Sequence, residues 1–374
     1  MADRLSQALP EDHASGHFIG RAQGPHGPCV IAVREGRIFD LTGVVATTAG
    51  AVIRRVFTGG EEIGTVETGL PEGWTLLSPI DLQCVKAAGV TFALSAIERV
   101  IEERARGDAE SAAAIRAALE DKVGSGIRAV VPGSPEAAEL KSALIAEGMW
   151  SQYLEVAIGP DAEIFSKSPV LSTVGHGAPI GVRSDSNWNN PEPEVVLVCD
   201  SHGEIVGATL GNDVNLRDFE GRSALLLSKA KDNTASCAIG PFIRLFDDTF
   251  TLDDVRQASV DLVIDGPEGY RLEGTNDMGQ ISRDPSELVR QCLSEHHYPD
   301  GFVLFCGTLF APTQDRDTPG AGFTHKVGDV VTISSRRIGS LRNTVLRSRD
   351  APAWTMGISE FAQNLAARGL IDRI

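Results

Sequence analysis

Apolar and polar residues change their spacing along the 374-residue chain, and these changes divide it into three parts. Residues 17–80 carry short apolar runs separated by turn residues, which is typical of strands joined by tight turns. Between residues 93 and 150 the apolar positions follow a helical spacing. After residue 161, short runs rich in valine and isoleucine return between glycines and prolines. The pattern predicts a small β-rich domain, a helical segment and a mainly β body.

Residues 1–80 are expected to form the small domain and residues 81–374 the body. The apolar runs of the small domain predict short strands, with a hairpin closed at Glu35-Gly36. These runs are HFIGRAQ (17–23), CVIAVREGRIFDLT (29–42) and GAVIRRVFTGG (50–60). In the body, strand pairs are expected at 259–277 and 327–347.

Helical patterns follow one another in the second part, and another ends the chain. Ser134 and Pro135 form a good helix start, because serine is favoured as the N-cap and proline at the first helical position. The ranges predicted as helices are 95–107, 109–123, 134–148 and 358–370.

Composition excludes some partners. The chain has 34 basic and 51 acidic residues, a net charge of −17, which disfavours nucleic acid as a partner. Its six cysteines form no C-x-x-C pair, as expected of reduced thiols in a cytoplasmic protein. No apolar run reaches the length of about 18 residues that a membrane span needs. We therefore expect a soluble cytoplasmic protein without membrane or nucleic-acid partners.

Candidate chemistry begins in a valine-rich strand at 192–199. Glu192 and Glu194 lie two residues apart, so their side chains share one face of the strand. A hairpin closed around Ser201-His202 would place residue 211 opposite residue 192 and Asp213 just beyond it. On spacing alone, a solvent-facing strand edge explains the two glutamates equally well.

Three convergent carboxylates repel one another unless a proton or a cation joins them. A set of three oxygen ligands suits a hard divalent ion, Mg²⁺ or Mn²⁺. Magnesium prefers six ligands, so a substrate with two oxygens would find open positions. The sequence thus predicts a metal site that binds substrate directly.

Several motifs in chain order resemble the fumarylacetoacetate hydrolase family over roughly residues 75 to 350. They are EPE (192–194), GNDVNLRDFE (211–220), KAK (229–231), GT (307–308) and VGDVV (327–331). The resemblance implies an α+β, mainly β fold, a mixed β-roll with peripheral helices beside the small β-rich N-terminal domain. It also implies that Glu192, Glu194 and Asp213 bind Mg²⁺, that Lys231 contacts substrate oxygens, and that Thr308 contacts the substrate carboxylate.

Within this family, the chain is most similar to the branch that dehydrates 2-keto-3-deoxy sugar acids. The activity expected is Mg²⁺-dependent dehydration of a 2-keto-3-deoxypentonate to 2,5-dioxopentanoate (α-ketoglutarate semialdehyde) in sugar-acid catabolism. Glu98 and Lys231 are the acid and base candidates, and residues 93–150 match a mobile helical lid of the family. A homo-oligomer, dimer or tetramer, is the family's expectation.

Ser95 bears on the choice of reaction. The family's C–C hydrolases carry a short N-Y-x-x-H-x-x-E element, which we place on residues 91–98. Glu98 then occupies the Glu position, while Ser95 replaces the histidine that helps to activate water. A serine hydroxyl is no base near neutral pH without an activating partner, so we expect Ser95 to contact a substrate hydroxyl instead.

Other functions stay open at this point. The same metal-bound chemistry would serve a C–C hydrolase of a 2,4-diketo acid, of the fumarylacetoacetase or acylpyruvase type, or a 2-oxo acid decarboxylase. A protein that binds a sugar acid without turning it over is a third class. The products formed from each substrate would separate them.

Overall fold

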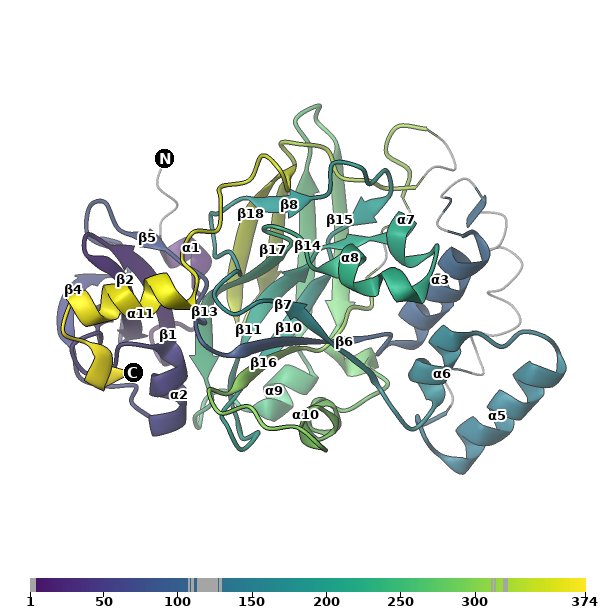
Figure 1. The fold of residues 1–374 in the computed structure, drawn as a ribbon, viewed down its shortest axis with the longest axis horizontal. Helices are drawn as coiled ribbons and strands as arrows, with labels where there is room; N and C mark the ends of the chain where they lie inside the picture. Colours follow the sequence, from purple (N-terminus) through teal and green to yellow (C-terminus); the bar gives the residue numbers. More distant parts are fainter. Residues whose placement is uncertain are drawn as a thin grey trace.

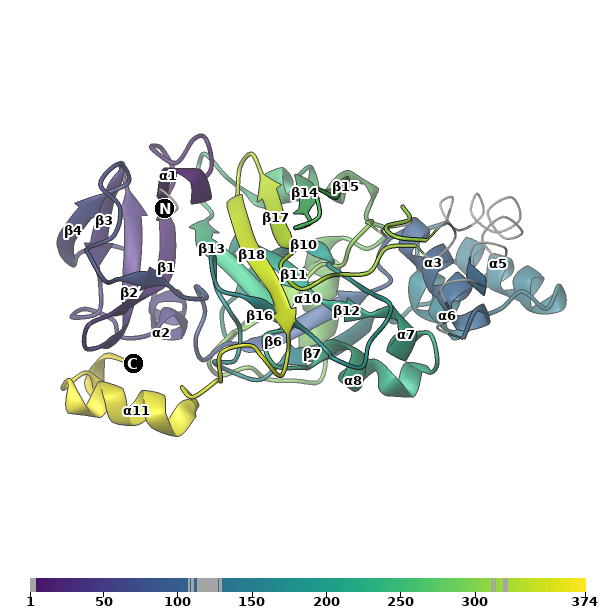
Figure 2. The same cartoon turned by 90° about the horizontal axis from the view of Figure 1, so that it is seen from above.

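A computed structural model describes residues 5–106, 108, 111–112, 127, 130–310, 312, 314–318 and 322–374. The N-terminal strands lie at one end of the molecule, the sheets of the body in the middle, and helices α3, α5 and α6 at the other end (Figure 1). The same order along the long axis is visible from above (Figure 2).

The N-terminal part contains strands where the first two of its apolar runs predict them. Its elements are α1 (Leu5–Ala8), β1 (Phe18–Gly24), β2 (Gly27–Arg34), β3 (Arg37–Asp40), α2 (Thr48–Arg54), β4 (Glu61–Thr65) and β5 (Thr75–Leu76). The hairpin between β2 and β3 turns at Glu35 and Gly36, whose φ angles of 50° and 72° match a tight hairpin turn.

The apolar run at 50–60 does not continue the strand pattern, and our expectation there is wrong. Its first residues belong to helix α2, because the helix start is capped twice. Thr47 Oγ1 accepts the Gly50 N–H at 2.9 Å, and the buried Asp81 carboxylate accepts the N–H groups of Thr48 and Ala49. Asp81 is distant in sequence, so local pattern alone does not reveal this cap.

The central elements form a long mixed sheet and a second, five-stranded sheet. The remaining strands are β6 (Cys84–Gly89), β7 (Glu163–Ser168), β8 (Ile180–Val182), β9 (Asn189–Asn190), β10 (Pro193–Cys199), β11 (Ile205–Asp213), β12 (Asn215–Leu216), β13 (Cys237–Leu245), β14 (Ser259–Asp265), β15 (Arg271–Asp277), β16 (Phe302–Phe305), β17 (Val330–Ser335) and β18 (Gly339–Arg347). The expected pairs at 259–277 and 327–347 are confirmed as β14–β15 and β17–β18. This mixed architecture confirms the α+β, mainly β fold class.

The long sheet crosses the whole body. Its strand order is β4-β3-β2-β1-β13-β11-β10-β16-β6-β7, with β5 paired to β1. The second sheet has the strand order β15-β14-β17-β18-β8 and packs on the long sheet. An apolar core that includes Val195 of β10 and Leu341 of β18 fills the space between the two sheets. Because β1 pairs with β13, the N-terminal strands extend the sheet of the body. The domain boundary at residue 80 therefore stays a prediction.

The helices lie around the sheets. They are α3 (Ala93–Arg104), α5 (Pro135–Ala146), α6 (Gln152–Ile158), α7 (Arg217–Glu220), α8 (Leu227–Lys231), α9 (Leu252–Arg256), α10 (Pro285–Leu293) and α11 (Ile358–Ala367). Ser134 caps α5 as predicted, its hydroxyl accepting the Ala137 N–H at 3.2 Å. The helix predicted at 109–123 lies outside the described residues, apart from 111–112.

Helices lie at both ends of the molecule. Helices α3, α5 and α6 share an apolar cluster of their own, separate from the core between the sheets. The terminal helix α11 lies beside the N-terminal strands, where Asn364 Nδ2 donates to His26 O at 2.9 Å (Figures 1 and 2). Within the parts of the chain that the structure describes, no helix combines the length and the apolar character needed to span a bilayer.

Candidate active site

The β10–β11 hairpin brings the three predicted carboxylates together. Glu194 pairs with Gly211, and the Asp213 N–H donates to Glu192 O at 3.1 Å, so Asp213 lies directly opposite Glu192. Our predicted pairing of residues 211 and 192 is therefore wrong by two positions. A register shift after Val198 and a turn held by the Asp200 carboxylate, which accepts two backbone N–H groups, lengthen the loop.

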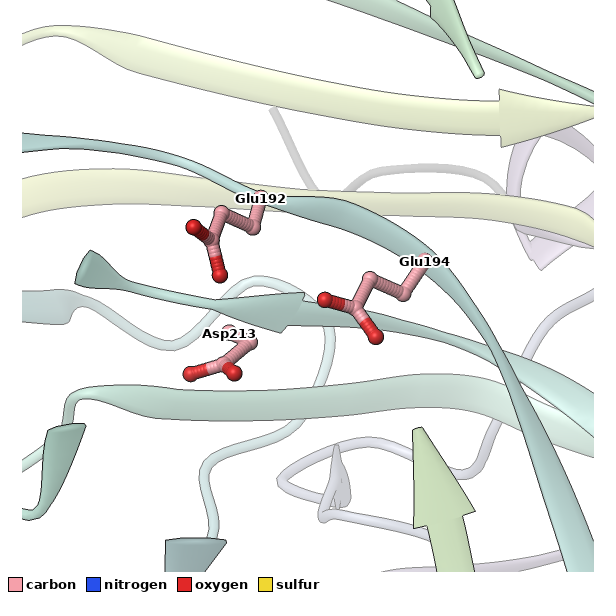
Figure 3. A group of neighbouring side chains, drawn as sticks. All are labelled: Glu192, Glu194 and Asp213. Atoms are coloured by element: carbon pink, nitrogen blue, oxygen red, sulfur yellow. The ribbon is translucent and has the colours of Figure 1, made fainter. Parts of the chain in front are cut away.

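The convergence itself is confirmed. Glu192, Glu194 and Asp213 each offer an oxygen within 4.8 Å of the others, and all three side chains are buried. Figure 3 shows the three side chains close to one another on the neighbouring chain segments that carry them. This placement excludes the alternative of a solvent-facing strand edge.

The charges around this triad suit a divalent cation. The cavity wall contains five carboxylates, including Glu163 and Glu220, and two cationic side chains, Arg99 and Lys231. Burial, together with the charges of Asp213 and Glu192, raises the pKa of Glu194 well above its usual value, although the Gly307 N–H donates to its Oε2 at 2.6 Å. A bound divalent ion would offset this excess of negative charge, so the residues present fit Mg²⁺ or Mn²⁺.

Two lysines form ion pairs with the carboxylates of the triad. Lys231 Nζ donates to Glu192 Oε2 at 2.5 Å and to Asp213 Oδ2 at 3.1 Å, while Lys167 Nζ lies 2.8 Å from Asp213 Oδ1. Burial lowers the pKa of Lys231, but the charges of Asp213 and Glu192 outweigh it and the net shift is upward. For Asp213, burial is outweighed by the two lysines, and its pKa falls. In this arrangement Lys231 is an ammonium held by two carboxylates of the triad.

Six of the seven predicted site residues line one cavity; they are Ser95, Glu192, Glu194, Asp213, Lys231 and Thr308. Ser95, in the first turn of α3, has its hydroxyl engaged by the backbone of Phe92: it donates to Phe92 O at 2.8 Å and accepts the Phe92 N–H at 3.3 Å. Its position on the wall agrees with a substrate contact, yet its donor already has a partner.

Glu98 is the predicted residue that is not among the cavity-lining groups. Its carboxylate lies 3.2 Å from Arg217 Nη2 on α7. Arg217 also donates to the buried Glu102 at 2.6 Å, so it joins α3 to α7 through two glutamates. Asp218, the next residue along the chain, accepts hydrogen bonds from the Ser186 hydroxyl and the Asn187 N–H. An acid–base role for Glu98 stays a prediction.

Glu163 is the residue that sequence reasoning missed. It begins β7, opposite Gly89 of β6, and lines the cavity. A Cβ at residue 89 would come within 2.3 Å of Glu163 Oε2, so the glycine makes room for this carboxylate. Burial and the nearby charge of Glu220 raise the pKa of Glu163 to about 7, which is suitable for a general base at neutral pH. No local motif marks it, because its neighbours come from distant parts of the chain.

The chain is similar in sequence to known proteins. The family model for the fumarylacetoacetate (FAA) hydrolase C-terminal region matches residues 152–346. A 2-dehydro-3-deoxy-D-arabinonate dehydratase of Saccharolobus solfataricus is 34% identical over 190 residues, which cover 50% of this chain and 59% of that protein. A probable 2-keto-3-deoxyxylonate dehydratase of Haloferax volcanii is 33% identical over 197 residues, 53% of this chain and 64% of the relative. The chain thus matches less than two thirds of the length of either relative.

A solved structure has the same fold. It is that of 2-keto-3-deoxy-D-arabinonate dehydratase complexed with magnesium and 2,5-dioxopentanoate, and the match has a TM-score of 0.64 at 23% identity. It covers 88% of this chain and 99% of the other.

Proposed function

Because the chain belongs to the fumarylacetoacetate hydrolase family, we propose that it is a Mg²⁺-dependent hydro-lyase acting on a 2-keto-3-deoxypentonate. The product would be 2,5-dioxopentanoate, the compound found with magnesium in the dehydratase of the same fold. The observation that carries the proposal is the cavity in which Glu163 and Lys231 flank a buried triad of carboxylates. Both curated relatives carry dehydratase names, which supports the same reaction.

Glu192, Glu194 and Asp213 would hold the metal ion. When bound, Mg²⁺ would accept the C1 carboxylate and the C2 ketone oxygen of the substrate and make the C3 protons more acidic. Mn²⁺ prefers similar oxygen ligands and is expected to replace it. Thr308, which follows β16, is proposed to donate to the substrate carboxylate, since it lines the cavity and its neighbour Gly307 donates to Glu194.

Glu163 is the proposed general base and Lys231 the proposed general acid. With a pKa of about 7, Glu163 is proposed to take a proton from C3. Lys231, which lines the same cavity, is proposed to give a proton to the C4 hydroxyl, which leaves as water. A proton returned to C3 and a proton lost from C5 would move the double bond to C4–C5 and give an enol. A proton added at C4, with loss of the C5 hydroxyl proton, would then convert this enol into the aldehyde. The overall change is the loss of one water molecule.

We assign the base to Glu163 in place of Glu98 on the basis of position. Glu98 is held by Arg217 and does not line the cavity, whereas Glu163 does. A hydrolase would also need a group that activates water, and the Ser95 hydroxyl already donates to Phe92 O. These contacts support elimination over hydrolysis.

A product assay tests the proposal. The purified protein would be incubated with Mg²⁺ and each of the two C4 epimers of 2-keto-3-deoxypentonate, and separately with a 2,4-diketo acid. We expect semialdehyde from at least one epimer and little pyruvate from the diketo acid. Faster release of pyruvate from the diketo acid would overturn the proposal in favour of a hydrolase. A homo-oligomeric state also stays a prediction, which sedimentation of the same sample would test.

A further inference from the structure

Arg99 connects the helical end of the molecule to the carboxylate triad. From α3, its Nη2 donates to Glu192 Oε1 at 2.6 Å. Its Nη1 lies 2.7 Å from Glu102 and 2.9 Å from Glu220. The Arg99 side chain is only 12% exposed. One guanidinium therefore joins α3, α7 and the residue that precedes β10.

Glu192 has both carboxylate oxygens engaged by cations. Arg99 holds Oε1, and Lys231 holds Oε2 at 2.5 Å. A carboxylate that binds Mg²⁺ brings an oxygen to about 2 Å from the ion, where a cationic donor on the same oxygen is repelled. Metal binding by Glu192 therefore weakens the ion pair that at least one of the two cations makes with it.

Arg99 is better placed to withdraw than Lys231. Its two other partners, Glu102 and Glu220, lie outside the triad, so it keeps two ion pairs after losing Glu192. The second partner of Lys231 is Asp213, which belongs to the triad itself. Loss of the Arg99–Glu192 ion pair thus leaves fewer charges without a partner than loss of the Lys231–Glu192 ion pair would.

Helix α3 has features that are typical of a mobile element. It packs in its own apolar cluster with α6, separate from the core between the sheets, and lies at the far end of the molecule (Figure 1). Val90, which connects β6 to this segment, has a φ of 55°; the left-handed conformation is strained for a β-branched residue and is typical of functional positions. Val90 also lines the cavity.

The cavity is too small for the proposed substrate. Its volume of about 20 Å³ exceeds only slightly the roughly 10–15 Å³ that one water molecule requires. A five-carbon acid needs several times that space, so part of the wall has to move before it binds.

We propose that Arg99 competes with the divalent ion for Glu192, so that metal binding releases α3 from the β10–β11 hairpin and opens the cavity. Arg99 is then a positioning residue that makes access for the substrate depend on the metal. This inference rests on the metal site of the proposed function and is independent of the identity of the substrate.

Mn²⁺ binding to the full chain, measured by electron paramagnetic resonance after removal of metals, tests the competition. Arg99→Met should bind Mn²⁺ more tightly than wild type, by about tenfold if the ion pair is occupied nine-tenths of the time. Arg104→Met is the matched control, since Arg104 is an exposed residue on the same helix, and it should bind like wild type. If Arg99→Met fails to fold, the charge-balanced double variant Arg99→Met/Glu220→Gln takes its place.

Hydrogen exchange of the α3 amides tests the release of the helix. Adding Mg²⁺ should speed exchange in α3 of wild type and of Arg104→Met, whereas in Arg99→Met exchange should already be fast and insensitive to Mg²⁺. Equal or weaker Mn²⁺ affinity in the folded Arg99 variants, or α3 exchange that Mg²⁺ slows or leaves unchanged in wild type, would overturn the inference alone. A wild-type protein that binds no Mn²⁺ would overturn the proposed function as well.

Discussion

The two walls of the cavity are built by different means. On the hairpin wall, the backbone pairing of β10 and β11 fixes Glu192, Glu194 and Asp213, because each side chain follows from the register of its strand. On the helical wall, Arg99 is fixed by ion pairs with Glu192 and Glu220, which are far away in sequence. The hairpin wall is thus suited to hold an ion in one place, and the helical wall can change partners without breaking a sheet.

The largest effect is expected from breaking the hairpin wall. Glu194→Gln removes a charged ligand and should abolish detectable Mn²⁺ binding and turnover while the protein stays folded. The matched change on the helical wall is Glu102→Gln, because this buried carboxylate pairs with two arginines and not with the triad. It should keep Mn²⁺ binding and lower stability by about 1–3 kcal/mol. Mn²⁺ affinities are measured by calorimetry. Equal affinities in the two variants would contradict the assignment of metal binding to the hairpin wall.

Glu163→Gln should have the next largest effect. If Glu163 takes the C3 proton, its loss should lower kcat by about 10²–10⁴-fold, whereas Glu98→Gln should change kcat by less than about tenfold. The measurement is steady-state formation of semialdehyde by both variants. The reverse order would restore the base to Glu98 of helix α3.

Lys231→Met should reduce kcat by on the order of a hundredfold with a smaller change in KM, because the proton transfer matters mainly in the transition state. Metal affinity is measured alongside, since removal of the lysine also frees an oxygen of Glu192. A loss confined to KM would make Lys231 a substrate anchor.

The pH dependence should be the mildest effect. A base with a pKa of about 7 must be ionised to act, so kcat/KM should fall by about tenfold per pH unit below 7 and level off above it. The acidic limb should disappear in Glu163→Gln and persist in Glu98→Gln. An acidic limb that Glu163→Gln retains would assign the titration to another group.

The same contrast between the two walls explains which residues of the site can be predicted from the sequence and which cannot. The i, i+2 spacing of Glu192 and Glu194 and the family motifs identify six of the residues that line the cavity, because strands and motifs are local. The pairing register was off by two positions since a shift after Val198 is invisible in the apolar pattern. Glu163 and the contacts of Arg99 escaped prediction because their partners lie far apart in the chain, Arg99 and Glu192 being 93 residues apart.

Anomalous scattering from Mn²⁺ in crystals grown with pyruvate tests the metal site most directly. We expect one peak with oxygens of Glu192, Glu194 and Asp213 about 2 Å away, and with the carboxylate and ketone oxygens of pyruvate and a water molecule completing the coordination. A peak elsewhere in the molecule, or pyruvate bound in this cavity without an ion, would contradict the assignment of the triad as the metal centre.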